Sequence, residues 1–168
     1  MRILQVAGQA NSGKTRLLEA LLVHLPAAHI IKWSHHPIAE DAPASDSGRL
    51  GATGLPTVLG HPDGLVWRGT LSRTQVYAMV ASTVDPDALV VVEGDKWAPH
   101  PKIWIGAELP PSALAVGLVI GPKPPDDSTV PWRQAEIPLP DDAIHELTAY
   151  LRVAWPTYAV PYGRTIDA

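Results

Sequence analysis

The amino-acid sequence predicts an α/β fold of the P-loop NTPase type, a three-layer αβα sandwich with a mainly parallel sheet and a β-hairpin insertion. Two runs, at 3–7 and 87–94, are apolar almost throughout, which is typical of strands buried on both faces. A glycine-rich loop follows the first run, and helical patterns alternate with strand patterns along the chain. The length of 168 residues predicts a single domain, 1–168, with one substantial core.

Periodicity places the elements along the chain. The first helix carries a leucine stripe and is ended by Pro26. The sequence His61-Pro62-Asp63-Gly64 separates two short strands and predicts a β-hairpin. Strands are expected at 3–7, 28–33, 57–59, 65–68, 87–94, 102–105 and 113–120, and helices at 14–25, 72–84 and 141–155.

The two later helices have their own signals. Ser72 is a favourable N-cap residue, and the helix after it is expected to turn Val76, Met79 and Val80 inward. The last helix has an apolar face made of Ile144, Leu147 and Leu151. The polar stretch 34–55 is long for a loop in a compact domain, which indicates either function or disorder.

Composition and charge limit the possible partners. The net charge of −4 gives no general attraction to nucleic acid or to an anionic membrane, so anions must bind at a local site. The absence of cysteine excludes disulfides and thiolate chemistry and suits a cytoplasmic protein. No apolar run approaches the roughly 20 residues that span a bilayer. The first residues run directly into the first strand, so no signal peptide is expected.

A phosphate-binding loop follows the first strand. The segment Gly8-Gln9-Ala10-Asn11-Ser12-Gly13-Lys14-Thr15 matches the P-loop (Walker A) pattern G-x-x-x-x-G-K-[ST] at every fixed position. Its glycines let the backbone approach a phosphate, which its amides and the start of the next helix attract. Lys14 is expected to reach the β- and γ-phosphates, and the Thr15 hydroxyl to coordinate Mg²⁺. The predicted nucleotide-binding residues are Gly8, Gln9, Ala10, Asn11, Ser12, Gly13, Lys14, Thr15 and Arg16.

Glu93 lies at the carboxyl end of the second strong strand pattern. An acidic residue at this place in a P-loop protein usually faces Mg²⁺ or its water shell. We therefore expect Thr15 and Glu93 as metal residues, and Lys14 and Glu93 as catalytic residues. The alternative for Glu93 is a solvated residue at a strand end.

Four segments, taken in order, resemble a known family. After the P-loop come Lys32-Trp33-Ser34-His35-His36 and Asp46-Ser47-Gly48-Arg49-Leu50-Gly51-Ala52. Next come Leu89-Val90-Val91-Val92-Glu93-Gly94-Asp95-Lys96 and Pro101-Lys102-Ile103. This V-E-G-x-K and P-K-I pair is much more specific than the P-loop. From its start to about Ile105, the chain resembles the molybdopterin-guanine dinucleotide biosynthesis protein B (MobB) family.

The resemblance implies a GTP-binding accessory protein with weak GTPase activity that helps to attach GMP to molybdopterin. It implies GTP and Mg²⁺ as cofactors, molybdopterin and a molybdenum cofactor guanylyltransferase as partners, and a homodimer formed by sheet extension. The hairpin at 57–68 could supply that edge or be an ordinary surface hairpin. The resemblance also implies that Asp46 is a metal and catalytic residue near the Mg²⁺ shell or in a mobile switch segment. A solvated loop aspartate is the alternative.

Other residues leave alternatives open. His35 and His36 could bind a metal together with Asp46, but polar or phosphate contacts suit loop histidines better. Lys96 and Lys102 flank Trp97 and His100, forming a basic-aromatic patch for phosphate, pterin or partner, or an ordinary surface.

The sequence lacks the Asn-Lys-x-Asp motif that reads guanine, although 121–124 is a plausible place for base contact. The alternative function is a small-molecule P-loop kinase that uses ATP. No arginine-rich lid of the kind that kinases use is found in the sequence, which disfavours this alternative. A regulator that binds nucleotide without turnover is a third possibility, disfavoured by the complete P-loop and Glu93.

Overall fold

The computed structural model describes residues 1–26, 28–33, 49, 52–53, 57–61, 64–68, 71–127 and 129–163. The chain divides into two compact units, one formed by residues 1–34 and 85–168 and the other by residues 35–84. The expectation of a single domain stays a prediction.

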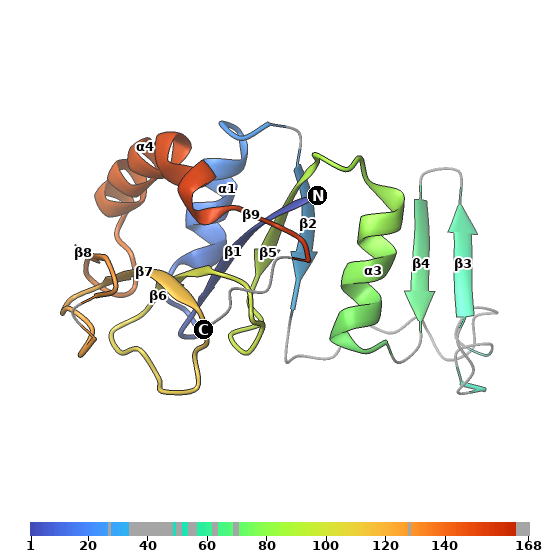
Figure 1. Cartoon of the computed structure of the whole chain (residues 1–168), viewed down its shortest axis with the longest axis horizontal. Coiled ribbons are helices and arrows are strands. Elements are labelled where there is room, and N and C mark those ends of the chain that lie inside the picture. The colour runs from blue at the N-terminus through green and yellow to red at the C-terminus, as the bar shows by residue number, and fades with distance from the viewer. Residues whose placement is uncertain are drawn as a thin grey trace. The chain divides into compact units, whose positions relative to one another are not determined.

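The larger unit is built on a mainly parallel sheet, as predicted (Figure 1). Its strand order is β2-β5-β1-β6-β7-β8, and the short strand β9 pairs antiparallel with β1. The strands are β1 (Arg2–Gly8), β2 (Ala28–Lys32), β5 (Leu89–Glu93), β6 (Lys102–Ile105), β7 (Val116–Gly121), β8 (Trp132–Gln134) and β9 (Val160–Pro161). Because β1, β2 and β5 are parallel, their carboxyl ends lie at one edge, where Glu93 is in register with Val6 and Lys32.

Two helices of this unit cover one face of the sheet. Helix α1 (Lys14–Leu22) and helix α4 (Asp141–Tyr158) pack against each other and against the strands (Figure 1). Each buried leucine or isoleucine stabilises the fold by about 1.5–3 kcal/mol relative to exposure. Of the predicted leucine stripe, Leu22 and Leu25 are only partly buried. The buried helix residues include the other three leucines of the stripe and the predicted face of α4: Leu17, Leu18, Leu21, Ile144, Leu147 and Leu151.

The opposite face over β6 and β7 is covered by irregular chain. Ala7, Trp104 and Val119 form its buried centre, and residues of the segments 109–116 and 130–132 pack against them. Because side chains alternate along a strand, Trp104 lies on this face while Ile103 and Ile105 face the helices. The described residues of this unit therefore place helices on one face of the sheet only.

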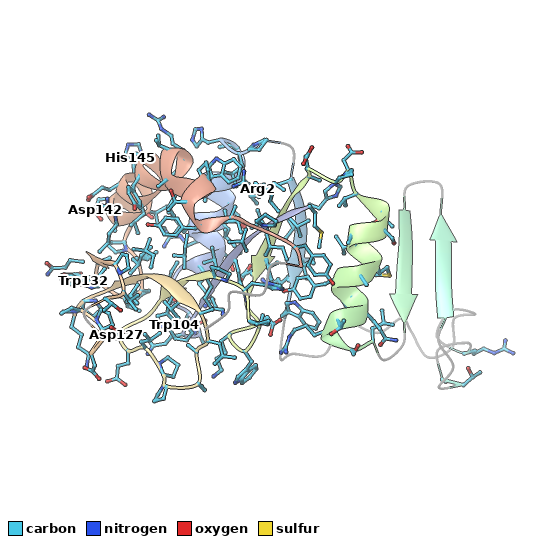
Figure 2. The ribbon with its side chains drawn as sticks, viewed as in Figure 1. Arg2, Trp104, Asp127, Trp132, Asp142 and His145 are labelled. Atoms are coloured by element: carbon cyan, nitrogen blue, oxygen red, sulfur yellow. The ribbon has the colours of Figure 1, made fainter. Side chains whose placement is uncertain are left out.

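The ends of β1 and α4 are joined by one side chain. Arg2 (labelled in Figure 2) donates hydrogen bonds of 3.0 Å to the Pro156 and Ala159 carbonyls, and its guanidinium lies 5.3 Å from the centroid of the Trp155 ring. The last helix thus continues through Pro156 to Tyr158, beyond its predicted end at residue 155. Strands β8 and β9 are too short to give a periodic pattern and were not predicted.

The described residues of the smaller unit include the predicted hairpin and helix α3 (Arg73–Thr83). Strands β3 (Thr57–His61) and β4 (Gly64–Arg68) pair antiparallel, with His61 opposite Gly64. Helix α3 has the predicted N-cap Ser72, whose hydroxyl accepts from the Gln75 amide, and the Gln75 side chain completes a capping box.

The expected inward face of α3 is wrong at one position. Met79 is 40% exposed, and the buried residue of the helix is Tyr77. A tyrosine ring removes more apolar area from water than a methionine side chain, so the ring determines which face is buried. No helix in the described parts of the chain has the length and apolar character needed to cross a membrane.

Candidate nucleotide-binding site

The P-loop connects β1 to α1 at the carboxyl edge of the sheet. At its start the backbone of β1 lies very close to β6, since a Cβ atom on Gly8 would be 2.0 Å from the Ile105 carbonyl oxygen. Asn11 and Gly13 adopt positive φ angles of 56° and 95°, which bend the loop into the first turn of the helix. Gly8 is therefore required by the sheet itself, in addition to any phosphate.

Hydrogen bonds from three other segments hold the loop in shape. The Gln9 amide donates to the Ile105 carbonyl at 3.0 Å, and the Gln9 side-chain oxygen accepts from the Ala107 amide at 3.0 Å. On the other side, the Leu139 amide donates to the Ser12 carbonyl at 3.1 Å. Contacts with the segments after β6 and before α4 thus hold the P-loop in its shape without a bound nucleotide.

Lys14 begins α1 and turns back over the loop. Its ammonium donates to the Gln9 carbonyl and, at 3.3 Å, to the Ser12 hydroxyl. Burial lowers the pKa of Lys14 below its usual 10.5; the Glu93 charge opposes this shift and the Lys32 charge adds to it. A phosphate group would compensate this half-buried positive charge.

Thr15 and Glu93 meet at the same edge. The Thr15 hydroxyl donates to the Glu93 carboxylate at 2.8 Å, and the Lys32 ammonium lies 3.5 Å from the other carboxylate oxygen. The Glu93 side chain is only 13% exposed. The structure thus brings together the predicted residues Lys14, Thr15 and Glu93 and adds Lys32.

The hydroxyl–carboxylate pair suits a hard divalent cation. Mg²⁺ prefers oxygen ligands and usually takes only one or two from protein, with water and phosphate supplying the others. Two oxygens 2.8 Å apart, one of them from the largely buried Glu93 carboxylate, meet this requirement. Among the described residues, no group of three or more His, Cys, Asp or Glu side chains could hold a metal.

Arg16 is placed differently from the other predicted binding residues. Its guanidinium forms an ion pair with Asp141 and donates to the Leu139 carbonyl at 3.4 Å. Its side chain therefore links α1 to the start of α4. Ala10 and Asn11 are exposed at the tip of the loop, whereas Ser12 is fully buried.

A cavity of about 270 Å³ adjoins the loop on its Gln9 side. Its walls come from the turns after β6 and β7, and they include Ala107, Glu108, Lys123, Pro124 and Asp126. The Lys123 ammonium lies 3.7 Å from the Glu108 carboxylate. The predicted place for base contact, 121–124, thus contributes Lys123 and Pro124 to a cavity beside the P-loop.

The expected basic-aromatic patch is wrong at one of its two lysines. Lys102 is 1% exposed, and its ammonium donates to the carbonyls of Ala98, His100 and Leu114. These bonds satisfy a buried charge and fix the loop after β5, so this lysine is unavailable to a ligand. Lys96 lies 4.7 Å from the centroid of the Trp97 ring, which is partly exposed.

Three sequence candidates, His35, His36 and Asp46, lie outside the described residues. Two contributions were not predicted, those of Lys32 to the charge around Glu93 and of Leu139 to the loop. The sequence contained a signal for Lys32, because this lysine lies at the end of a predicted strand. In a parallel sheet its side chain lies at the same edge as Glu93. No sequence signal marked Leu139, which comes 127 residues after its partner Ser12.

Comparison with known sequences gives a family. A family model described as molybdopterin guanine dinucleotide synthesis protein B (MobB) matches residues 3–112. A protein of Haemophilus influenzae, called molybdopterin-guanine dinucleotide biosynthesis adapter protein, is 33% identical over 119 residues. The match spans 60% of this chain and 61% of that relative, so less than two thirds of its length is covered.

Comparison with solved structures supports the fold. A crystal structure of molybdopterin-guanine biosynthesis protein B aligns with a TM-score of 0.58 at 18% identity, covering 92% of this chain and 99% of that one. A MobB homologue from Bacillus stearothermophilus aligns with a TM-score of 0.58 at 22% identity, covering 92% and 98%. The fold is thus the α/β fold of MobB structures, and the match over residues 3–112 shows that the chain belongs to the MobB family.

Proposed function

We propose that this MobB-family protein binds GTP with Mg²⁺, hydrolyses it slowly, and assists the attachment of GMP to molybdopterin by a molybdenum cofactor guanylyltransferase. The observation that carries the proposal is the convergence of Lys14, Thr15 and Glu93 at the mouth of a preformed P-loop. The printed names of the family and of its H. influenzae relative support the biosynthetic role.

Each residue of the site has a separate proposed role in binding the nucleotide or the metal. Amides of the loop from Gly8 to Gly13 and the start of α1 attract the phosphates. Lys14 neutralises β- and γ-oxygens, and the lowered pKa of its half-buried ammonium reflects a charge that a phosphate would stabilise. Thr15 and Glu93 would hold Mg²⁺, which supplies charge neutralisation at the phosphates. Glu93 also orients water at the γ-phosphate, and Lys32 compensates its charge.

Asp46 is proposed to complete this site from the segment after β2. Its role rests on the family resemblance, since the residue lies outside the described part of the chain. The described cations at this site are Lys14, which is half-buried, and Lys32, whose side chain is 57% exposed, and this partial shielding suits slow hydrolysis. We expect a homodimer, as the family resemblance implies. We also expect a cytoplasmic location, which the cysteine-free composition suits.

The cavity beside Gln9 is proposed to bind the guanine base. Guanine differs from adenine in offering two adjacent N–H donors, which one carboxylate can accept together. Asp126 lines the cavity and has no hydrogen bond or ion pair within the described ranges, whereas Glu108 is paired with Lys123. We therefore propose that the Asp126 carboxylate accepts hydrogen bonds from guanine and that the aliphatic part of the Lys123 side chain packs against the face of the base.

Calorimetric titration with Mg²⁺-GTP and Mg²⁺-ATP tests the proposal. Wild-type protein is expected to prefer GTP, Lys14→Ala to lose binding, and Lys96→Ala, outside the loop, to keep it. Preference for ATP would place the alternative kinase first, and binding of neither nucleotide would refute the P-loop assignment.

A matched pair of variants tests the base assignment. Asp126→Asn should reduce the preference for GTP roughly tenfold, since a hydrogen bond to a charged group contributes about 1.5–3 kcal/mol. Asp127→Asn is the control, because its carboxylate already accepts from the Thr129 amide at 2.9 Å and hydroxyl at 2.7 Å. Equal nucleotide preference in both variants would contradict the role of Asp126.

A further inference from the structure

A second cavity lies between the sheet edge and the last helix. It has a volume of about 550 Å³, within the range of small-molecule sites, and is bordered by β8 and α4. Figure 2 labels Trp132 on β8 and Asp142 and His145 on α4, the two elements on either side of it. None of its lining residues belongs to the P-loop or to the cavity beside Gln9. We call it the β8–α4 groove.

The floor of the groove is apolar and its β8 wall offers main-chain groups. Leu118, Ala135 and Leu147, all part of the core, form the floor. The Val119 amide donates to the Pro131 carbonyl and the Ala135 amide to the Gly121 carbonyl. In a parallel ladder this pattern turns the peptide groups of Trp132 and Gln134 away from β7. They lie at the end of the strand order, where an added planar ligand can hydrogen-bond to them.

A cation lies on an aromatic ring in the groove. The Arg133 guanidinium is 3.4 Å from the centroid of the Tyr150 ring. Among the described residues it has no carboxylate partner, so its N–H donors are available to an anion. With a net charge of −4 on the chain, an anion binds only where such a local cation is presented.

The aromatic ring beneath Arg133 is itself fixed. The hydroxyls of Tyr150 and Tyr158 are 2.7 Å apart in a hydrogen bond. Burial, reinforced by this bond, raises the pKa of Tyr158 to about 12. The Tyr158 phenol therefore stays protonated at neutral pH, and its hydrogen bond holds Tyr150 as a rigid shelf for the guanidinium.

A carboxylate completes the groove on the helix side. Glu146 lies four residues before Tyr150, so both project from the same face of α4. Glu146 lines the groove, is exposed, and has no ion pair within the described ranges. The groove thus combines a flat floor, a stacked cation, main-chain donors and acceptors at a strand edge, and one acceptor-only carboxylate.

From this combination we infer that the β8–α4 groove binds a phosphorylated pterin. The 2-amino-4-oxopyrimidine edge of a pterin offers adjacent N–H donors to Glu146. Its planar ring stacks on the open face of the Arg133 guanidinium, and its phosphate accepts hydrogen bonds from the guanidinium edge or adjacent amides. The inference rests on the proposed function, in which GMP is joined to a pterin phosphate. Guanine has the same ring edge, so GMP is the other source of this chemistry.

Quenching of pterin fluorescence on titration with neopterin monophosphate tests the inference. Lys14→Ala is used as the background so that the P-loop does not contribute. Arg133→Gln should weaken binding at least tenfold, and Arg133→Lys should restore only part of it because lysine lacks the planar fork. Arg152→Gln is the matched control, since it removes an exposed arginine of α4 outside the groove.

Three results would overturn the inference. One is the absence of quenching, another is equal binding by Arg133→Gln and Arg152→Gln, and the third is tighter binding of GMP than of neopterin monophosphate. Calorimetry with Mg²⁺-GTP on Arg133→Gln without the Lys14 change separates the two proposals. Retained GTP binding with lost pterin binding is expected. Failure of wild-type protein to bind GTP would refute the proposed function and leave the pterin result to be judged alone.

Discussion

The hydroxyl of Thr15 donates a 2.8 Å hydrogen bond to the carboxylate of Glu93, joining the first turn of α1 to the end of β5. The two residues are 78 positions apart in sequence, and the parallel pairing of β5 with β1 brings them together. The Lys32 ammonium, 3.5 Å from the same carboxylate, comes from the strand on the other side of β5. Three elements thus converge on one oxygen-rich point beside Lys14.

Replacing Glu93 by glutamine should separate nucleotide binding from metal-dependent turnover. The amide keeps the size of the side chain but loses the negative charge that Mg²⁺ and water orientation require. We expect GTP hydrolysis to fall by a factor of 10 or more, since general base or positioning groups contribute about 10²–10⁴-fold. Nucleotide affinity measured without Mg²⁺ should be unchanged or higher.

The control for this variant is Glu19→Gln, an exposed glutamate on α1. Hydrolysis rates and calorimetric affinities, each with and without Mg²⁺, are the measurements. Wild-type turnover in the Glu93 variant would remove this residue from the proposed site.

Lys102→Met should destabilise the protein without affecting nucleotide binding. The variant leaves the carbonyls of Ala98, His100 and Leu114, of which Ala98 is fully buried, without the donor that satisfies them. The expected loss is about 2 kcal/mol or more, since a buried group without its partner costs about 1–3 kcal/mol. Urea unfolding measures it, with Lys96→Met as the surface control, expected within about 0.5 kcal/mol of wild type. Equal stability of the two variants would contradict the structural role of Lys102.

Two glycines of β7 should respond very differently to alanine. A Cβ atom on Gly121 would be 2.2 Å from the Gly106 carbonyl oxygen, a backbone atom that cannot move alone. On Gly117 the nearest atom would be a Tyr158 ring carbon at 3.8 Å, an ordinary contact. Gly121→Ala is expected to cost about 3 kcal/mol or more, and Gly117→Ala less than about 1 kcal/mol. Thermal unfolding of the two variants measures this difference. Similar midpoints would show that β7 can move away from the Gly106 carbonyl at little cost in stability.

Local signals in the sequence predict most of the described strands, the helices α1, α3 and α4, and the centre of the candidate site. The P-loop is a continuous motif, so its geometry follows from neighbouring residues. Glu93 was predicted because apolar residues define its strand and a parallel sheet gathers strand ends at one edge. The capping box at Ser72 is likewise contained within four residues.

Features that depend on distant contacts could not be predicted in the same way. Nothing around Lys102 indicates that its ammonium will be surrounded by carbonyls, one of them 12 residues away. The ion pair of Arg16 with Asp141 joins residues 125 apart and directs a predicted binding residue to another helix. Polar residues in a motif can serve the fold or the ligand, and only tertiary contacts distinguish these roles.

The lowered pKa of Lys14 predicts a specific pH dependence of stability. Because burial disfavours the ammonium, the folded state releases this proton at a lower pH than the unfolded chain, whose lysine has the usual value of 10.5. Between these two values the unfolded state binds more protons, so the free energy of unfolding rises with pH. Below the folded-state pKa of Lys14 the ammonium is charged in the folded protein, and the free-energy cost of its partial burial is fully present.

Two variants isolate this contribution. Lys14→Arg keeps the charge at every pH and Lys14→Met lacks it, so neither has the proton release of wild type. Relative to Lys14→Arg, wild-type stability should increase as the pH rises from neutral toward 10.5, and the advantage of Lys14→Met over wild type should shrink. Urea unfolding over a pH series measures both differences. Saturating nucleotide should abolish the trend, because phosphates favour the charged amine; a trend that persists with GTP bound would place Lys14 away from the phosphates.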